Sequence, residues 1–192
     1  MHGYPLSSLG VTADFRDHFL LGANDMTNDF FASFAARDLL AGIGQYSSTM
    51  TISQVVKFFE RQGVIFTKTM IQNYVRIGLL PTPAEKRFYH SGHLAMLAMI
   101  HTLKDVISLD ETRRLFCLAD IRAADFNSHL DGRKKAEAAY KALLTAQHEA
   151  LEKMTTVFLE NNANDPLAAI MRFVAAGLLA GMAVQTLLAD HS

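Results

Sequence analysis

The run from Gly92 to Val106 constrains the fold of this chain more than any other segment, because most of its side chains are apolar. The apolar residues recur at helical spacing, and a helix that is apolar on all faces must be largely buried. The sequence as a whole is 50% hydrophobic and 19% charged, which allows a sizeable core and excludes a disordered protein. We therefore expect a mainly α-helical globular fold that buries this helix.

Two shorter helices are predicted before this run. The first opens at Thr51, carries one apolar stripe and ends near Gly63. The second spans residues 68–77, between Thr67 as its N-cap and Gly78 as its C-terminal stop. Two short helices with a tight connection between them make a helix-turn-helix.

A short basic and aromatic segment follows these two helices. Pro81 and Pro83 interrupt the helical pattern, because proline lacks the amide proton that a helix needs. Residues 84–90 then contain Lys86 and Arg87 beside two aromatic residues. We expect this segment to form a strand of a small β wing.

Both flanks of the central part are predicted to be helical. Residues 1–49 are expected to form an irregular lead-in and one helix that extends to Leu40 before glycines end it. Residues 108–119 are expected to form another helix, opened by a capping box of Ser108 and Glu111.

The last third of the chain has a different pattern. A long amphipathic helix is predicted over residues 133–160, where apolar positions spaced by four and three residues form a heptad seam with one polar interruption. The seam consists of Tyr140, Leu144, Gln147, Leu151, Met154 and Phe158. A final helix is predicted from Pro166 to about Ala189.

Positive charge is concentrated in one part of the chain, although the whole protein has a net charge of −1. The segment from Thr51 to Gly92 holds six lysines and arginines against two glutamates, which gives it a charge of +4. A local basic block is typical of a surface that binds nucleic acid. We accordingly divide the chain into residues 1–49, a central domain over 50–120, and a helical region over 121–192.

The order of these features resembles the DNA-binding domain of the MerR family. The resemblance rests on TISQVVKFFERQGVIFTKTMIQNYVRIGLLP and, after it, on KRFYHSGHLAMLAMIHTLKDVISLDETRRLF, which together cover residues of about 51–118. The chain is more similar still to a bacterial family of domains of unknown function with MerR-like features, in which an IQNYVRIGLLP-like string is characteristic. We therefore expect a mainly α fold: a MerR-like winged helix-turn-helix with a small β wing, plus an additional N-terminal helix and C-terminal helices.

Several residues acquire roles through this resemblance. It implies that the helix over 68–77 enters the major groove of DNA and that the wing contacts the backbone beside it. Tyr74 and Arg76 match the end of the family's recognition helix. Arg87 and Tyr89 match the Arg-x-Tyr of the family's wing.

Two departures from the MerR pattern change the expected DNA sequence but not the expected docking. Many MerR proteins carry Arg-Tyr-Tyr where this chain has Gln72, Asn73 and Tyr74. The turn before Thr67 is also about two residues longer here. Gln72 and Asn73 suit the reading of bases, because each can make two hydrogen bonds to adenine.

Phosphate contacts are predicted on either side of the residues that read bases. Thr67, Lys68 and Thr69 lie at a helix N-terminus, where the amides and the helix dipole favour a phosphate. The cations at the end of the helix and in the wing also suit phosphate contact. The predicted DNA-binding residues are Thr67, Lys68, Thr69, Gln72, Asn73, Tyr74, Arg76, Lys86, Arg87 and Tyr89.

Each of these assignments has a plainer alternative that the sequence leaves open. Tyr74 can be a core residue, because aromatic side chains on short helices usually pack inward. Lys86 and Arg87 can belong to an ordinary charged turn. Gln72 and Asn73 can be polar surface residues without a partner.

Three histidines, His90, His93 and His101, raise the question of a metal site, but their pattern disfavours one. Zinc sites need three or four converging ligands, whereas these histidines lie mostly in the apolar helix, without carboxylate or thiol partners at ligand spacing. The sequence also contains no Gly-rich phosphate loop, no Gly-x-Ser-x-Gly and no recognisable Cys/His pair. We expect no catalytic residue, no metal and no cofactor, and a protein that is not an enzyme.

The location of the protein is predicted from its cysteine, its N-terminus and its last helix. Cys117 is the single cysteine, and the N-terminus has neither the basic start nor the long apolar stretch of a signal peptide. Residues 173–189 are uncharged and contain Gly177-x-x-x-Gly181, a pattern that also packs membrane helices, but a span needs about 20 apolar residues. We expect a cytoplasmic protein with a buried terminal helix, and a membrane anchor is the alternative.

Together these features predict a transcriptional regulator that binds double-stranded DNA through residues 68–77 and a basic wing at 84–90. A homodimer through the C-terminal helices is expected, because one such module reads too few base pairs for useful specificity. An apolar small-molecule effector bound after residue 120 is a further expectation. The alternatives are a non-enzymatic protein-interaction module on a winged-helix scaffold and a tail-anchored membrane protein with a DNA-binding head.

Overall fold

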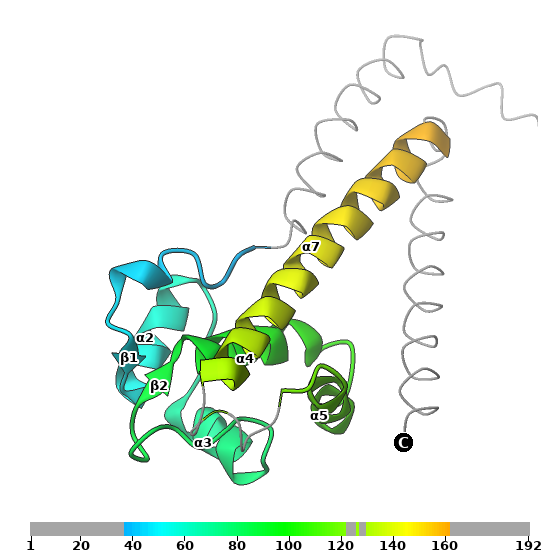
Figure 1. Cartoon of the computed structure of the whole chain (residues 1–192). Helices are drawn as coiled ribbons and strands as arrows, with labels where there is room; N and C mark the ends of the chain where they lie inside the picture. The colour runs from blue at the N-terminus through cyan, green and yellow to red at the C-terminus, as the bar shows by residue number, and fades with distance from the viewer. Residues whose placement is uncertain (1–36, 122–125, 127–129, 162–192) are drawn as a thin grey trace, which may run out of the picture.

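The computed structural model describes residues 37–121, 126 and 130–161 of the chain. These residues form five α-helices, one 3-10 helix and an antiparallel sheet of two strands (Figure 1). In chain order the elements are η2 (Ile43–Gln45), β1 (Thr49–Met50), α2 (Ile52–Arg61), α3 (Lys68–Arg76), β2 (Tyr89–His90), α4 (Ser91–Leu103), α5 (Leu109–Leu118) and α7 (Leu130–Asn161). The prediction of a mainly helical fold is confirmed.

α4 is the central helix of the described residues, and α7 runs across it (Figure 1). Every residue from Gly92 to Ile100 is buried, and the helix contacts α7, β2 and α5. The prediction of a buried apolar helix is confirmed, although the helix ends at Leu103 rather than at Val106. Residues 104–106 form a turn in which the N–H groups of Val106 and Ile107 both donate to the carbonyl of Leu103 over 2.9 Å, and Val106 is 65% exposed.

α2 lies between a capping contact and a glycine, as its sequence predicts. The backbone N–H of Thr51 donates to Oε1 of Gln54 over 2.7 Å, which gives a partner to an amide at the helix N-terminus. Gly63 follows the helix with a φ of 75°, a left-handed value that favours glycine. The inner side of α2 consists of Val55, Phe58 and Phe59, all of which are buried.

α3 is delimited by signals of the same kind. The hydroxyl oxygen of Thr67 accepts a hydrogen bond from the N–H of Met70 over 3.1 Å, as expected of an N-cap. Gly78 follows α3 with a φ of 72°. Ile71 and Tyr74 lie on the buried side of the helix and belong to the same core as the inner side of α2. The outer side of α3 remains exposed.

The two strands connect the segments that precede α2 and α4. They pair in antiparallel register, with Thr49 opposite His90 and Met50 opposite Tyr89. Of the predicted wing strand over 84–90, only the last two residues therefore form a regular strand. The residues before them form a tight loop that projects from the sheet (Figure 1).

α7 crosses α4 at close range beside Gly92. A Cβ added to Gly92 would lie 2.8 Å from the backbone Cα of Arg133, which is closer than real Cβ atoms approach other atoms. It would also lie 3.1 Å from the side-chain atom Cε1 of Phe126. Next to this contact, the hydroxyl of Ser91 donates a hydrogen bond to Oε1 of Glu137. The first turn of α4 is thus the place where α7 is fixed to the rest of the fold.

α7 begins earlier than the sequence suggests. The helix starts at Leu130 rather than at residue 133, so that Asp131 and Gly132 belong to its first turn. A glycine within a helix costs only about 1 kcal/mol relative to alanine, and Gly132 is buried, so tertiary packing outweighs this local preference.

The heptad seam of α7 is described in its first half. Tyr140 is buried, and Leu144, Gln147 and Leu151 are half-buried. The other positions between residues 141 and 150 are exposed, apart from Leu143. Met154 and Phe158 lie outside the described side chains.

The segment before η2 is a turn rather than the end of the predicted N-terminal helix. The N–H of Leu39 donates to the hydroxyl of Tyr140 over 2.7 Å. The N–H of Leu40 donates to Oδ1 of Asp38 over 2.9 Å, and this carboxylate also accepts from the hydroxyl of Tyr140 over 3.1 Å. Because side chains bind these amides, residues 39–42 form turns instead of a helix. Burial raises the pKa of Tyr140 to about 12, so its hydroxyl stays protonated and can donate.

Several expectations on the chain ends lie outside the described residues. They concern the helix before residue 37, the final helix over 166–189 and most of the expected effector region. Within the described ranges, no helix is long and apolar enough to cross a membrane. The uncharged run over 173–189 lies outside the described ranges, so this finding does not concern it.

Replacing Gly92 by alanine tests the close crossing of α4 and α7. The new methyl group would meet the backbone of Arg133, which cannot move without displacing α7, so we expect Gly92→Ala to destabilise the protein by about 3 kcal/mol. Gly44→Ala is the matched control, because no atom lies within 4 Å of a Cβ there. Urea unfolding of the full chain measures both, and equal midpoints for the two variants would contradict this packing.

Candidate functional site

The outer face of α3 is polar and basic. Lys68, Gln72 and Arg76 follow one another at intervals of four residues, which places them on one side of the helix, and all three are exposed. Thr69 is exposed beside them, and Asn73 is half-buried. α3 contains no acidic residue. The face therefore offers hydrogen-bonding groups and two cations without a neighbouring negative charge from its own helix.

Tyr74 lies on the opposite side of α3. It is only 6% exposed, and burial raises the pKa of its hydroxyl. The backbone N–H groups of Leu79 and Leu80 both donate to its carbonyl, over 2.9 and 3.0 Å, which holds the chain that leaves α3. Of the two interpretations of Tyr74 that the sequence leaves open, burial supports the core residue. Tyr74 fixes α3 from beneath.

Asn73 and Arg76 contact each other at the C-terminal end of the outer face. Nη2 of Arg76 donates to Oδ1 of Asn73 over 2.6 Å. The amide oxygen of Asn73 is therefore engaged within the protein. A side chain needs both its oxygen and its NH₂ group to make two hydrogen bonds to one base. The oxygen of Asn73 has a second lone pair for a base, so the contact with Arg76 orients the amide and leaves it able to bind.

The N-terminal end of α3 is exposed. Thr67, Lys68 and Thr69 are all exposed there. The hydroxyl of Thr67 serves the N–H of Met70, while the amides of the first turn point along the helix axis without helical partners of their own. These amides and the ammonium group of Lys68 favour an anion at this end.

Two consecutive residues at the tip of the loop over residues 84–88, called the wing loop after the predicted wing, adopt left-handed backbone. The φ angle is 50° at Glu85 and 59° at Lys86. The N–H groups of Arg87 and Phe88 both donate to the carbonyl of Ala84, over 3.1 and 2.8 Å, and close the loop. A left-handed conformation costs about 1–2 kcal/mol for residues other than glycine, so these hydrogen bonds hold a strained turn. The turn directs Glu85, Lys86 and Arg87 into solvent.

Arg87 contacts two neighbours within the wing loop. Its Nη2 lies 3.5 Å from Oε2 of Glu85, and its guanidinium lies 4.5 Å from the centre of the Phe88 ring. The side chains of the ion pair are 68% and 70% exposed, so the pair is weak and can exchange partners readily.

Tyr89 does not extend from the wing. It is 4% exposed and forms part of β2, with its ring 5.5 Å from that of His93. Its place in the core anchors the base of the wing loop. Like Tyr74, it lies behind the exposed surface and supports it.

An open hollow of about 330 Å³ lies where the start of α2, the side of α3 and the wing loop meet. Its less exposed lining residues are apolar, namely Ile52, Val75 and Pro83. Its exposed lining residues are polar or charged, and they are Thr51, Gln72, Thr82, Lys86 and Arg87. The hollow therefore has an apolar floor and a polar, basic rim, and Tyr89 completes its lining.

The structure brings together only part of the predicted set. Gln72 lines the hollow together with the wing residues Lys86 and Arg87. The three residues at the N-terminus of α3, and Arg76, do not line it. Two further rim residues, Thr51 and Thr82, contribute hydroxyl groups and are not among the residues predicted from the sequence. The exposure of Thr51 could have been predicted from the sequence, because an N-cap residue lies at the exposed start of its helix. No local sequence pattern predicts that Thr82 lies at this rim.

Two of the three histidines contact each other, and the third lies apart from them. The N–H of His90 donates to Nδ1 of His93 over 3.1 Å, and Nδ1 of His90 lies 3.3 Å from the carbonyl oxygen of Ser48. The ring of His101 lies 6.0 Å from that of Phe66, farther along α4. Within the part of the chain that the structure describes, no group of three His, Cys, Asp or Glu side chains could hold a metal ion.

Comparison with known families identifies the family of this chain. The model of the family described as "Domain of unknown function (DUF1836)" matches residues 47–143, half of the 192 residues. The chain belongs to this family. The match spans β1, α2, α3, the wing loop, α4, α5 and the first part of α7. The predicted resemblance to a domain-of-unknown-function family is thereby confirmed. No curated protein and no solved structure matches the chain.

The pH dependence of stability tests the burial of His93. Burial, and then the nearby His90, lower the pKa of His93 from 6.5 to about 3. Between these values the unfolded chain binds a proton that the folded protein does not, so stability falls as the pH decreases. The contribution of one such group is about 1.4 kcal/mol per pH unit.

Comparison with His93→Gln isolates this contribution, because glutamine can still accept the hydrogen bond from the backbone of His90. We expect the difference in unfolding free energy between the wild type and His93→Gln to decrease by about 1.4 kcal/mol per unit from pH 6 to pH 4. His148→Gln, which replaces an exposed histidine, is the control. A difference that does not change with pH would show that His93 is not buried as described.

Proposed function

We propose that this protein is a cytoplasmic transcriptional regulator that binds double-stranded DNA through α3 and the wing at residues 84–90. The observation that carries the proposal is the hollow at which the outer face of α3 and the basic wing loop meet. Gln72 lines it from α3, and Lys86 and Arg87 line it from the wing. A helix and a loop that present amide and cationic groups on one side can contact base edges and phosphates together.

The packing of α2 and α3 supports a winged helix-turn-helix of the MerR type. Both helices are short and capped, and both bury their inner sides in one core. In such a motif the second helix lies in the major groove and its N-terminal residues are nearest to the bases. The polar outer face of α3 and its exposed N-terminus are suited to this position.

Gln72 and Asn73 are assigned to base edges on chemical grounds. Gln72 is exposed in the middle of α3 and can pair with adenine through its amide. Asn73 is bound to Arg76 in the free protein. A phosphate that attracts Arg76 would reorient the amide of Asn73, so the phosphate contact and the base contact of this turn are coupled.

The wing is assigned to the DNA backbone beside the groove. Lys86 and Arg87 are exposed on a loop whose strained turn fixes their direction. Glu85 is the nearest competing charge, and its pair with Arg87 is exposed. A phosphate can replace this carboxylate at little cost, so the pair does not prevent binding.

A protein-interaction module on the same scaffold is the alternative. An acidic or apolar surface over α3 and the wing would favour it. The exposed charges there are instead Lys68, Arg76, Lys86 and Arg87, against Glu85 alone. This balance favours a polyanion as partner.

A homodimer is the expected form of the regulator. The heptad spacing of Leu144, Gln147 and Leu151 on α7, each of which keeps part of its surface exposed, supports a helical dimer interface that continues into the C-terminal helices. Light scattering on the intact protein should give twice the chain mass of 21.2 kDa. A mass of one chain at micromolar concentration would refute this part of the proposal.

The salt dependence of DNA binding tests which residues contact phosphates. Replacing Arg76, Lys86 or Arg87 by alanine should weaken binding to all sequences alike and reduce the log–log salt slope by about 0.9, because one fewer counterion is released. Lys141→Ala is the control, because it removes an exposed cation from α7. Its slope should equal that of the wild type.

Gln72→Ala should behave differently from the cation variants. We expect a loss of about 1–3 kcal/mol on the preferred site, a salt slope like that of the wild type, and a relaxed preference at one or two base pairs. Circular dichroism confirms that each variant is folded. If folded Arg87→Ala and Gln72→Ala proteins both retain affinity and preference, this surface does not read DNA.

A further inference from the structure

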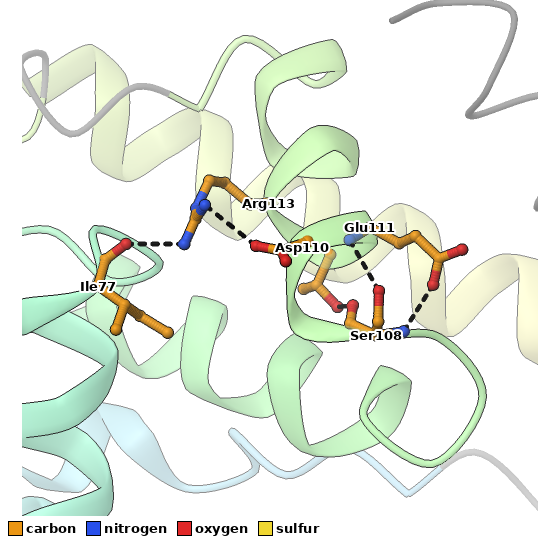
Figure 2. Close-up of polar contacts among 6 residues, drawn as sticks. Ile77, Ser108, Asp110, Glu111 and Arg113 are labelled. Carbon is orange, nitrogen blue, oxygen red and sulfur yellow. Dashed lines mark hydrogen bonds and ion pairs between the residues drawn. The ribbon is translucent and has the colours of Figure 1, made fainter.

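A side chain from α5 is bonded to the C-terminal end of α3. Nη2 of Arg113 donates to the carbonyl oxygen of Ile77 over 2.8 Å, across 36 residues of sequence. Ile77 is the C-cap residue of α3 and directly follows its last residue, Arg76. Figure 2 shows Arg113 reaching from α5 to this carbonyl. The contact joins two helices that are not neighbours in the chain.

Arg113 is held on its own helix by a second contact. Its Nη1 lies 3.1 Å from Oδ1 of Asp110, one turn earlier, and the two charges orient the guanidinium between Asp110 and Ile77 (Figure 2). The side chain of Arg113 is only 42% exposed, whereas that of Asp110 is 82% exposed. Arg113 therefore lies partly against the protein, with its charge partly balanced by Asp110.

The start of α5, from which Arg113 extends, is itself firmly capped. The N–H of Ser108 donates to Oε2 of Glu111 over 2.7 Å, and the N–H of Glu111 donates back to the hydroxyl of Ser108 over 3.2 Å (Figure 2). The hydroxyl of Thr112 donates to the carbonyl of Ser108 over 2.9 Å, and Thr112 is buried. These contacts fix the first turn of α5, so Arg113 extends from a rigid base.

The carbonyl of Ile77 is a suitable acceptor for this guanidinium. The last carbonyls of a helix have no partner inside it, and a cation at this end interacts favourably with the helix dipole. Ile77 is also bonded to the last turn of α3, because its N–H donates to the backbone carbonyl of Asn73 over 2.9 Å. Asn73 in turn holds Arg76 through its side chain. A guanidinium on Ile77 thus acts on the turn that carries two of the proposed DNA contacts.

We propose that Arg113 is a positioning residue for the DNA-reading helix. It fixes the peptide group between Ile77 and Gly78, and with it the orientation of Asn73 and Arg76, without touching DNA itself. The part of this inference that concerns DNA rests on the proposed function. The part that concerns the hold on α3 does not, and it can be measured on the free protein.

Three variants separate the bond to Ile77 from the ion pair on α5. Arg113→Met keeps the length of the side chain and removes its donors. Arg113→Lys keeps one donor and the charge. Asp110→Asn is the matched control, because it removes the ion pair and leaves the donor of Arg113 in place.

NMR of the free protein measures the hold on α3. The carbonyl carbon of Ile77 and the amide nitrogen of Gly78 belong to the peptide group that Arg113 binds, so their resonances should shift in Arg113→Met and remain near the wild-type values in Asp110→Asn. Amide exchange over α3 should become about tenfold faster in Arg113→Met, which corresponds to the loss of one hydrogen bond to a charged group. Unchanged Ile77 and Gly78 resonances, or unchanged exchange, would overturn the proposal.

DNA binding measures the consequence for reading. Arg113→Met should lower the ratio of specific to non-specific affinity about tenfold, with the salt slope unchanged, and Arg113→Lys should recover most of the ratio. A slope reduced by about 0.9 would show instead that Arg113 contacts a phosphate, and would overturn the positioning role. An unchanged ratio in a variant whose Ile77 resonance has moved would overturn it too.

The proposal remains testable if Arg113→Met fails to fold, and also if the wild-type protein has no sequence preference. If Arg113→Met fails to fold, Arg113→Lys decides: a ratio that falls only in proportion to the displacement of the Ile77 resonance supports the proposal. A displaced resonance with the wild-type ratio, or a reduced ratio with the wild-type resonance, overturns it. If the wild-type protein itself shows no sequence preference, the proposed function fails. The resonances and exchange rates of α3 then still decide whether Arg113 holds the helix.

Discussion

The burial of α4 on all sides is the constraint on which the rest of the structure depends. A helix without an exposed face has to be covered by other elements, and α7, α5 and the small sheet supply the cover. The close approach at Gly92 brings α7 onto the first turn of α4. α2 and α3 pack into the same core with one side each, which leaves their other sides to solvent. The outer face of α3 is thus exposed because only the inner side of α3 packs into the core around α4.

The elements with strong local signals could be predicted from the sequence. α2 and α3 begin and end where Thr51, Thr67, Gly63 and Gly78 indicate, because capping and left-handed glycines act within a few residues. The apolar run around α4 was equally clear, since its burial follows from composition alone. The exposure of most of the polar residues of α3 also follows from helical periodicity. These are properties that a short window of sequence contains.

The rest depends on contacts between distant residues, which no short window contains. Leu39 forms a turn because Tyr140, about a hundred residues later, binds its amide. The inward position of Tyr89 follows from the pairing of two short strands. The hollow at the proposed site arises from three separate segments, so the part played by Thr82 has no local signal. Arg113 is one of two neighbouring arginines on α5, and only the fold places it at the C-terminal end of α3.

Selection of bound sequences from a random DNA pool by the purified full-length protein tests the central claim most directly. The account predicts enrichment of one motif, and, for a dimer with two reading helices, of two half-sites whose centres lie about 10 base pairs apart or a multiple of this. Washing at a salt concentration that removes non-specific complexes makes the result decisive, because non-specific binding is the more sensitive to salt. A pool without an enriched motif under these conditions would contradict the account and would favour a protein as the partner of this surface.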